Sequence, residues 1–177
     1  MADTRVPEVE IREADFSLEE EYRRLCAQGG VNGACVLFAG LVRDHGSCGE
    51  LDTLELEHYP GMTEASIAKI IDEARTRWRV GAVRVIHRVG RLVPADQIVL
   101  VGVASTHRGD AFAACEFIMD YLKTRAPFWK REETPAGARW VDARDSDDSA
   151  AARWQTAGGE HAAESDELSW EEVERRR

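Results

Sequence analysis

Two lysines, Lys123 and Lys130, lie seven residues apart in the segment FIMDYLKTRAPFWKRE, which covers residues 117–132. Aromatic residues surround both lysines, although the chain as a whole carries a formal charge of -10. A lysine beside apolar walls and other cations gives up its proton more readily, and it can then act as an acid, a base or a nucleophile. The alternative interpretation is a solvated basic helix end, which the helix dipole favours.

Further cations follow two segments that the sequence predicts to be strands. Arg43 comes at the end of an apolar run over residues 33–42, and His107 and Arg108 follow a second run over residues 97–105. Anion binding requires fixed cations or clustered N–H donors, and a predicted helix begins directly after Arg108. His107 could equally be a hydrogen-bonded structural histidine, but the adjacent arginine and helix N-terminus favour an anion site.

The remaining histidines and the four cysteines give weaker signals. His58 and His87 are expected to be structural, and the histidines lack the spacing of metal ligands, so we expect neither a metal nor a cofactor. The cysteines contain no CxxC pair, which argues against a zinc site or a disulfide framework. Cys35 and Cys115 lie in apolar surroundings typical of core residues. Cys48, in a loop with glycines, is the most accessible of the four and the best candidate for a reactive thiol.

Helices and strands are both predicted, without strict alternation. Helices are expected over about residues 17–28, from Thr63 towards Gly81, and from Gly109 towards Pro127. Strands are expected over residues 33–42, 53–58, 82–89, 97–105 and 139–143, with a mobile loop over 44–50. This order favours a mixed α+β domain with about three helices over a doubly wound parallel sheet.

Composition limits the class of protein. The chain has 177 residues, 44% of them hydrophobic, which suits one domain with a substantial core. It contains neither an apolar run of membrane-spanning length nor a signal peptide, so we expect a cytoplasmic protein. A pI near 5.0 argues against nucleic-acid binding. Residues 155–177 are acidic and are expected to be a disordered tail behind a single domain over residues 1–154.

Several blocks of residues, in order along the chain, resemble one protein family. The blocks are GACVLFAGLVRDH (33–45), LELEHYPGMTE (54–64), VIHRVG (85–90), VGVASTHRGDAF (101–112), residues 117–132 and RWVDARDSD (139–147). Ordered blocks of unusual residues are far more specific than one short motif. The chain is similar to the large, catalytic subunit of molybdopterin synthase.

The resemblance implies a fold, a reaction and partners. The fold is of the α/β-hammerhead type, with a mixed, largely antiparallel sheet. The reaction transfers two sulfur atoms to cyclic pyranopterin monophosphate from the C-terminal Gly-Gly thiocarboxylate of a small ubiquitin-like subunit. The expected assembly is a homodimer within a heterotetramer, which binds neither nucleic acid nor a membrane. A cysteine-persulfide sulfurtransferase is one alternative; Cys35 and Cys115 lack a cationic setting, so a low thiol pKa is not expected there, and Cys48 is the best candidate for it. A non-catalytic pterin-binding or scaffold protein is the other alternative.

The resemblance also implies the residues of the site. Lys123 and Lys130 are the expected catalytic pair, and Arg144 is expected to reach the site of the other protomer. Leu41 stands where relatives often carry lysine, so no charge at that position is expected to act. The implied substrate-binding positions are Leu41, Val42, Arg43, His107, Arg108, Lys123, Lys130, Arg131, Glu132 and Arg144.

Overall fold

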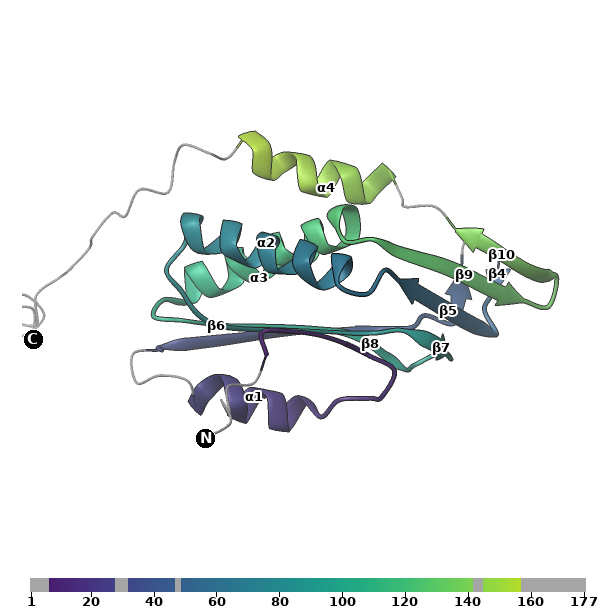
Figure 1. Ribbon diagram of the computed structural model, residues 1–177, viewed down its shortest axis with the longest axis horizontal. Helices are drawn as coiled ribbons and strands as arrows, with labels where there is room; N and C mark the ends of the chain where they lie inside the picture. The colour runs from purple at the N-terminus through teal and green to yellow at the C-terminus, as the bar shows by residue number, and fades with distance from the viewer. Residues whose placement is uncertain (1–6, 28–31, 47–48, 142–144, 157–177) are drawn as a thin grey trace, which may run out of the picture.

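A four-stranded sheet forms the centre of the protein. The computed structural model describes residues 7–27, 32–46, 49–141 and 145–156 (Figure 1). The strand order is β1-β6-β8-β2, with β1 parallel to β6 and the other pairs antiparallel. These strands are β1 (Val9–Arg12), β2 (Ala34–Leu41), β6 (Val80–Arg88) and β8 (Gln97–Ser105).

Helices cover both faces of this sheet. Helices α2 (Met62–Arg77) and α3 (Arg108–Arg125) lie on one face, and α1 (Leu18–Ala27) lies on the other (Figure 1). The last helix, α4 (Asp145–Thr156), packs on the outer side of α3. The main core lies between the sheet and α2 and α3, where Val85, Val101 and Phe117 are fully buried. Burial of this apolar surface is the main source of stability for the layered arrangement.

A second four-stranded sheet lies at one end of the molecule (Figure 1). Its order is β10-β9-β5-β7, and all its pairs are antiparallel. Gly90 has a φ of 79°, a conformation that glycine adopts without strain, where the chain passes from the first sheet into the second. The strands are β5 (Thr53–His58), β7 (Gly90–Leu92), β9 (Phe128–Thr134) and β10 (Gly137–Val141); β3 (His45–Gly46) and β4 (Gly49–Glu50) form a separate short hairpin.

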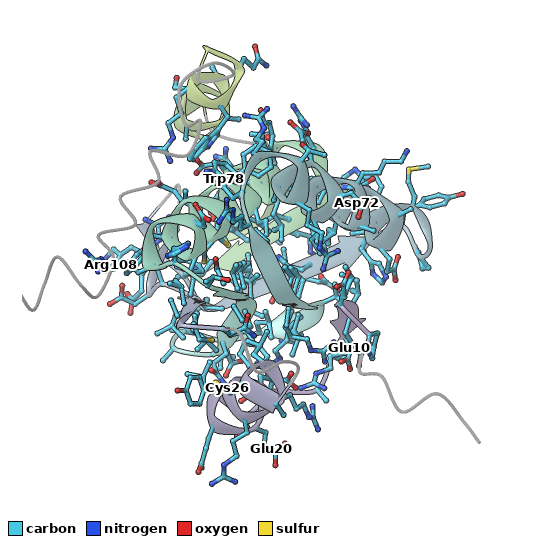
Figure 2. All side chains as sticks on the ribbon, turned by 90° about the vertical axis from the view of Figure 1, so that its left-hand side faces the viewer. Glu10, Glu20, Cys26, Asp72, Trp78 and Arg108 are labelled. Carbon is cyan, nitrogen blue, oxygen red and sulfur yellow. The ribbon has the colours of Figure 1, made fainter. Side chains whose placement is uncertain are left out.

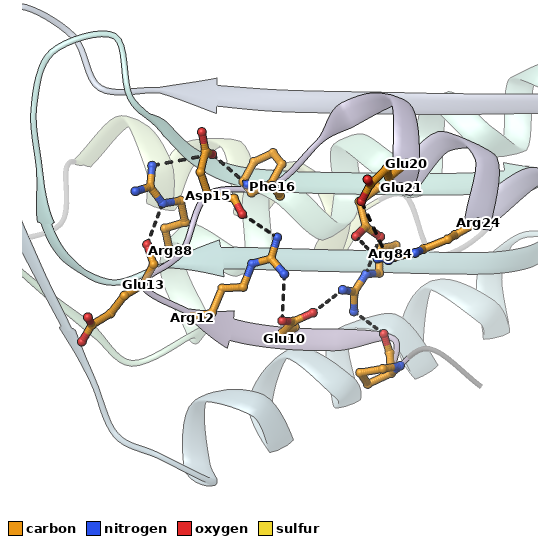
Figure 3. A network of polar contacts seen from close by, with 11 residues as sticks. Glu10, Arg12, Glu13, Asp15, Phe16, Glu20, Glu21, Arg24, Arg84 and Arg88 are labelled. Atoms are coloured by element: carbon orange, nitrogen blue, oxygen red, sulfur yellow. Dashed lines mark hydrogen bonds and ion pairs between the residues drawn. The ribbon is translucent and has the colours of Figure 1, made fainter. Parts of the chain in front are cut away.

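Buried charges hold β1 and α1 against the central sheet (Figure 3). The guanidinium of Arg84 on β6 donates to Glu21 of α1 over 2.9 Å and also pairs with Glu10 of β1. Arg84 and Glu21 are only 4% and 1% exposed. A buried ion pair needs such multiple partners, because removing one of them leaves an uncompensated charge in the interior.

The α+β class and most predicted elements are confirmed, but strands β1, β7 and β9 were not predicted, and there are four further differences. The predicted loop over residues 44–50 contains the β3–β4 hairpin. The helix expected to begin with a Thr63 cap has Gly61 as its N-cap, and the Glu64 carboxylate accepts the Gly61 N–H over 2.7 Å. The described residues contain four helices, since α4 was not predicted, and Gln155 and Thr156 of the expected tail end α4. None of the helices in the described ranges is long and apolar enough to span a membrane.

The fourth difference concerns β2, which we expected to be buried on both faces. It is an edge strand, because only β8 pairs with it among the described strands. Phe38 and Leu41 are 42% and 56% exposed, although an apolar run of this kind is typical of a central strand. β2 therefore carries more apolar side-chain surface than the described chain buries by itself.

Candidate functional site

A cavity of about 730 Å³ opens where the two sheets meet the C-terminal end of α3. Apolar side chains from β2, β5, β8 and α3 form most of its wall, and a few charged groups converge on it. Concave apolar sites with a small number of placed polar groups are typical of small-molecule sites. The polar and charged lining residues are Arg43, His45, His87, Lys123, Lys130 and Glu132.

Lys123 and Lys130 reach this cavity from two different elements. Lys123 lies in the last turn of α3, where the helix dipole favours a positive charge. The two residues Ala126 and Pro127 lead from α3 to β9. Successive side chains of a strand point to opposite faces, so Phe128, Lys130 and Glu132 share the face of β9 that lines the cavity. The sequence correctly grouped the two lysines but did not predict the strand that carries Lys130.

Glu132 fixes the position of Lys130. The Lys130 ammonium lies 2.7 Å from the Glu132 carboxylate, and Glu132 is fully buried. The β3–β4 hairpin closes over this carboxylate at Gly46, where a β-carbon would lie only 2.5 Å from Glu132 Oε2. A short charge-assisted contact in a desolvated setting holds both groups more firmly than a surface pair. Lys130 is therefore a positioned cation.

The segment after β2 forms another part of the wall. Leu41, Val42 and Arg43 all line the cavity, and the backbone of Val42 is fixed by hydrogen bonds with Asp96 and Ala95. His45 stands at the exposed rim, and its hydrogen bond to Asp44 raises the pKa of the imidazole. No role was expected for His45, because its distance in the sequence from the two lysines follows no recognisable pattern.

His87 is a further lining residue that we expected to be structural. Its Nδ1 lies 2.8 Å from the carbonyl oxygen of Arg88, and its ring stacks on Phe128 with centroids 3.9 Å apart. Burial lowers the pKa of His87 to about 4, so the imidazole is neutral near pH 7. Val83 and Val85 precede it on the same face of β6, and this alternation is the signal that could have placed His87 towards the core.

Some implied site residues do not reach this cavity. Arg131 lies on the opposite face of β9, because side chains alternate, and it pairs there with Glu55 over 2.8 Å and Glu133 over 3.0 Å. His107 and Arg108 are exposed at the N-terminal end of α3, where Arg108 projects from the surface (Figure 2). Fifteen residues of helix separate Arg108 from Lys123, a distance of about 22 Å. Arg144 lies outside the described residues.

The described cysteines, Cys26, Cys35 and Cys115, do not line the cavity. Burial raises the pKa of the Cys35 thiol to about 11 and that of Cys115 to about 12. A thiol with a raised pKa holds little thiolate near pH 7 and is a poor nucleophile, so burial argues against these two cysteines as sulfur carriers. No cysteine from the described part of the chain lines the cavity, and Cys48 lies outside that part.

Residues 11–125 match the family described as MoaE protein. The chain belongs to the MoaE family. The catalytic subunit of molybdopterin synthase from Escherichia coli (strain K12) is a relative with 56% identity over 154 residues, which cover 87% of this chain and 100% of that protein. The corresponding protein of Vibrio cholerae is 58% identical over 147 residues, which cover 83% of this chain and 97% of that protein.

Solved structures of the MoaE family have the same fold. The molybdopterin biosynthesis MoaE protein of Burkholderia ambifaria superposes with a TM-score of 0.74 at 53% identity, covering 85% of this chain and 99% of that one. Molybdopterin synthase from Staphylococcus aureus superposes with a TM-score of 0.71 at 31% identity, covering 78% of this chain and 99% of that one. The expected resemblance to molybdopterin synthase is therefore confirmed.

Proposed function

We propose that this protein is the catalytic subunit of a molybdopterin synthase. In this function it transfers two sulfur atoms to cyclic pyranopterin monophosphate, one from each of two thiocarboxylated small subunits, which are left as carboxylates. The observation that carries the proposal is the convergence of Lys123, Lys130 and Arg43 on one largely apolar cavity. An anionic substrate and an anionic thiocarboxylate both require cations, and low-dielectric walls strengthen each charge–charge contact.

The two lysines differ in their surroundings, which supports different roles. Lys130 is held by the buried carboxylate of Glu132, so it is suited to binding the substrate phosphate in a fixed geometry. Lys123 stands in the last helical turn beside Met119, Leu122 and Ala126. We assign it to the reacting sulfur, where it would stabilise negative charge and act as a proton donor or a transient acyl acceptor.

The small subunit would present its C-terminal Gly-Gly tail to this cavity. Glycines lack side chains, so an extended Gly-Gly segment can pass between the apolar walls formed by residues such as Phe38, Leu51 and Leu54. The thiocarboxylate at the end of the tail would then lie near the lysine ammonium groups. This arrangement supports a sulfurtransferase more strongly than a protein that only binds a pterin, since a binding protein has no need for a second anion site.

A homodimer would explain the distant positions of His107 and Arg108. The edge strand β2 begins at Ala34, which pairs with Ser105 just before His107, and it ends at Leu41 in the cavity wall. Antiparallel pairing of two β2 strands across a two-fold axis would place the start of one strand beside the end of the other. The partner's His107 and Arg108 would then approach the cavity formed by Lys123, and pairing would cover Phe38 and Leu41.

The test is reconstitution with defined components. The purified protein is mixed with thiocarboxylated small subunit and cyclic pyranopterin monophosphate, and dithiolene product is measured. Product formation that depends on Lys123 supports the proposal. Tight binding of both components without any product would instead identify the protein as a binding or scaffold protein. A variant lacking all four cysteines should keep its activity, and its inactivity would support the persulfide mechanism.

A further inference from the structure

One ring nitrogen of His87, Nε2, is available to accept a hydrogen bond from a ligand. Nδ1 lies 2.8 Å from the Arg88 carbonyl oxygen, which can only accept, so Nδ1 must carry the proton. Burial keeps the pKa of His87 near 4, so Nε2 of the neutral ring holds a lone pair and is a hydrogen-bond acceptor. Among the residues that the structure describes, none donates a hydrogen bond to Nε2.

The orientation of this ring is fixed. Phe128 stacks on one face with an interplanar angle of 21°, and the Arg88 carbonyl prevents rotation about the ring axis. His87 is only 6% exposed, and it lines the cavity that also contains Lys123 and Lys130. Nε2 is not among the fully buried atoms without a partner in the described residues, so it keeps contact with the cavity, where a ligand can donate a hydrogen bond to it.

The other polar groups of the cavity have the opposite character. Arg43 and Lys130 are donors that suit the phosphate, Lys123 is a donor near the reacting sulfur, and the Glu132 carboxylate is engaged by Lys130. A pterin presents an amino group and ring N–H groups, which require acceptors. Those donors need a neutral acceptor near the cations, because a further carboxylate would weaken the binding of the anionic phosphate.

We propose that His87 Nε2 accepts a hydrogen bond from an N–H group of the pterin ring and so selects the heterocycle of the substrate. This inference rests on the proposed function and adds a recognition contact to it. The cations bind the phosphate end, and His87 with Phe128 recognises the ring end. Because the contact exists in the bound ground state, it contributes to affinity more than to turnover.

The first experiment measures pterin binding without the small subunit. His87→Phe keeps an aromatic ring to stack on Phe128 but removes the acceptor, and we expect an increase in the dissociation constant of about 10-fold. His87→Gln can place its amide oxygen near the position of Nε2, so its loss of affinity should be smaller. His58→Phe is the matched control, since His58 lies close to His87 but does not line the cavity, and its affinity should equal that of the wild type.

A second measurement does not depend on any substitution. In protein labelled with ¹⁵N-histidine, the unprotonated Nε2 of His87 should move upfield when the cyclic pterin is added, as expected when a lone pair accepts a hydrogen bond. Addition of the small subunit alone should leave it unchanged. A shift caused only by the small subunit would assign Nε2 to the carrier tail and overturn the proposal.

The proposed function and the role of His87 can be contradicted independently of each other. If the wild-type protein forms no dithiolene product, the proposed function fails. If the wild type is active but folded His87→Phe binds the pterin with unchanged affinity, only the role of His87 is overturned. Should His87→Phe not fold, the nitrogen shift in the wild-type protein still decides the question.

Discussion

At the scale of single residues, the cavity combines groups of unequal mobility and charge. Lys130 is fixed by Glu132, Lys123 ends a helix, and His87 remains neutral in a buried position. These differences come from the environments that the fold supplies, since two identical lysine side chains acquire different partners. Substitutions at these positions should therefore have distinct signatures.

Lys123→Ala should lower product formation by at least ~100-fold, the range expected when a group assisting proton transfer or stabilising charge is removed. Binding of the small subunit should persist, because most single side chains contribute little to the affinity of a protein interface. Lys123→Arg should also be inactive, since guanidinium stays protonated and cannot accept a proton or an acyl group. Single-turnover rates and carrier affinity provide the measurement. Near-normal turnover of Lys123→Arg would show that positive charge alone suffices.

His87 should make the stability of the protein depend on pH. Its pKa is 6.5 in the unfolded chain and about 4 in the folded protein, so between these values the unfolded state binds more protons. The unfolding free energy therefore has its full value above pH 6.5 as far as His87 is concerned. It decreases as the pH falls towards 4, by up to about 3 kcal/mol. In urea unfolding, the unfolding free energy of the wild type should fall relative to that of His87→Phe as the pH decreases from 7 to 4, because only the wild type carries this imidazole. Parallel curves from pH 7 to 4 would contradict the buried neutral state.

At the scale of elements, short segments missed by the sequence analysis shape the site. The inward face of β9 carries Lys130 and Glu132, so its alternation does not resemble that of a strand with an apolar face. α4 was missed because, among its described side chains, Ala151 and Trp154 make the contact with the core, which is too few for a clear apolar period. The long helices and β8 were predictable from their apolar periodicity, whereas β9 and α4 depend on tertiary contacts that the sequence does not display.

The β3–β4 hairpin should tolerate no side chain at Gly46. In Gly46→Ala the new β-carbon would lie 2.5 Å from Oε2 and 2.8 Å from Cδ of Glu132, so the carboxylate must move away from Lys130. We expect reduced affinity for the pterin and a loss of about 1–3 kcal/mol in unfolding free energy. Gly109→Ala is the stability control, because its β-carbon would meet no atom within 4 Å. Unchanged substrate affinity in Gly46→Ala would show that Glu132 does not depend on the hairpin.

Trp154 should account for most of the attachment of α4. Its ring packs edge-on against Trp78 and Phe117, and its Nε1 donates to Asp120 over 2.7 Å. Trp154→Ala should lower the unfolding free energy by about 2 kcal/mol, less than for a fully buried tryptophan. Trp140→Ala, at a side chain that is 53% exposed, should change it by less than about 0.5 kcal/mol. Equal effects of the two substitutions in thermal or urea unfolding would contradict this assignment.

At the scale of the whole molecule, the separation of Arg108 from Lys123 argues for a shared site. Both residues are expected to act on substrate, yet one α3 helix holds them at opposite ends. The sequence-based prediction put these residues in one site. That prediction holds only if two chains contribute to the site, and no pattern within a single chain can reveal such sharing. The exposed apolar edge of β2 provides the surface through which the second chain would bind.

Mixed dimers can test this assembly. Arg108→Ala and Lys123→Ala should each be weakly active as homodimers. A dimer with one chain of each kind contains one site with both residues intact if Arg108 acts across the interface, so activity should recover to about half of the wild type per dimer. Differently tagged chains, purified together, allow the measurement. No recovery in a confirmed heterodimer would mean that Arg108 acts within its own chain or only stabilises it.

The connection between α3 and β9 consists of two residues, Ala126 and Pro127. Because strand side chains alternate, one inserted residue there would turn Lys130 out of the cavity and bring Trp129 into its place. Two inserted residues would restore the face but could displace the ammonium by about 7 Å, the rise of two strand residues. Chain length is therefore under tighter constraint here than at Pro135 and Ala136, which connect β9 to β10 and do not line the cavity. Chains that share this chemistry should vary in length at the second connection and not at the first.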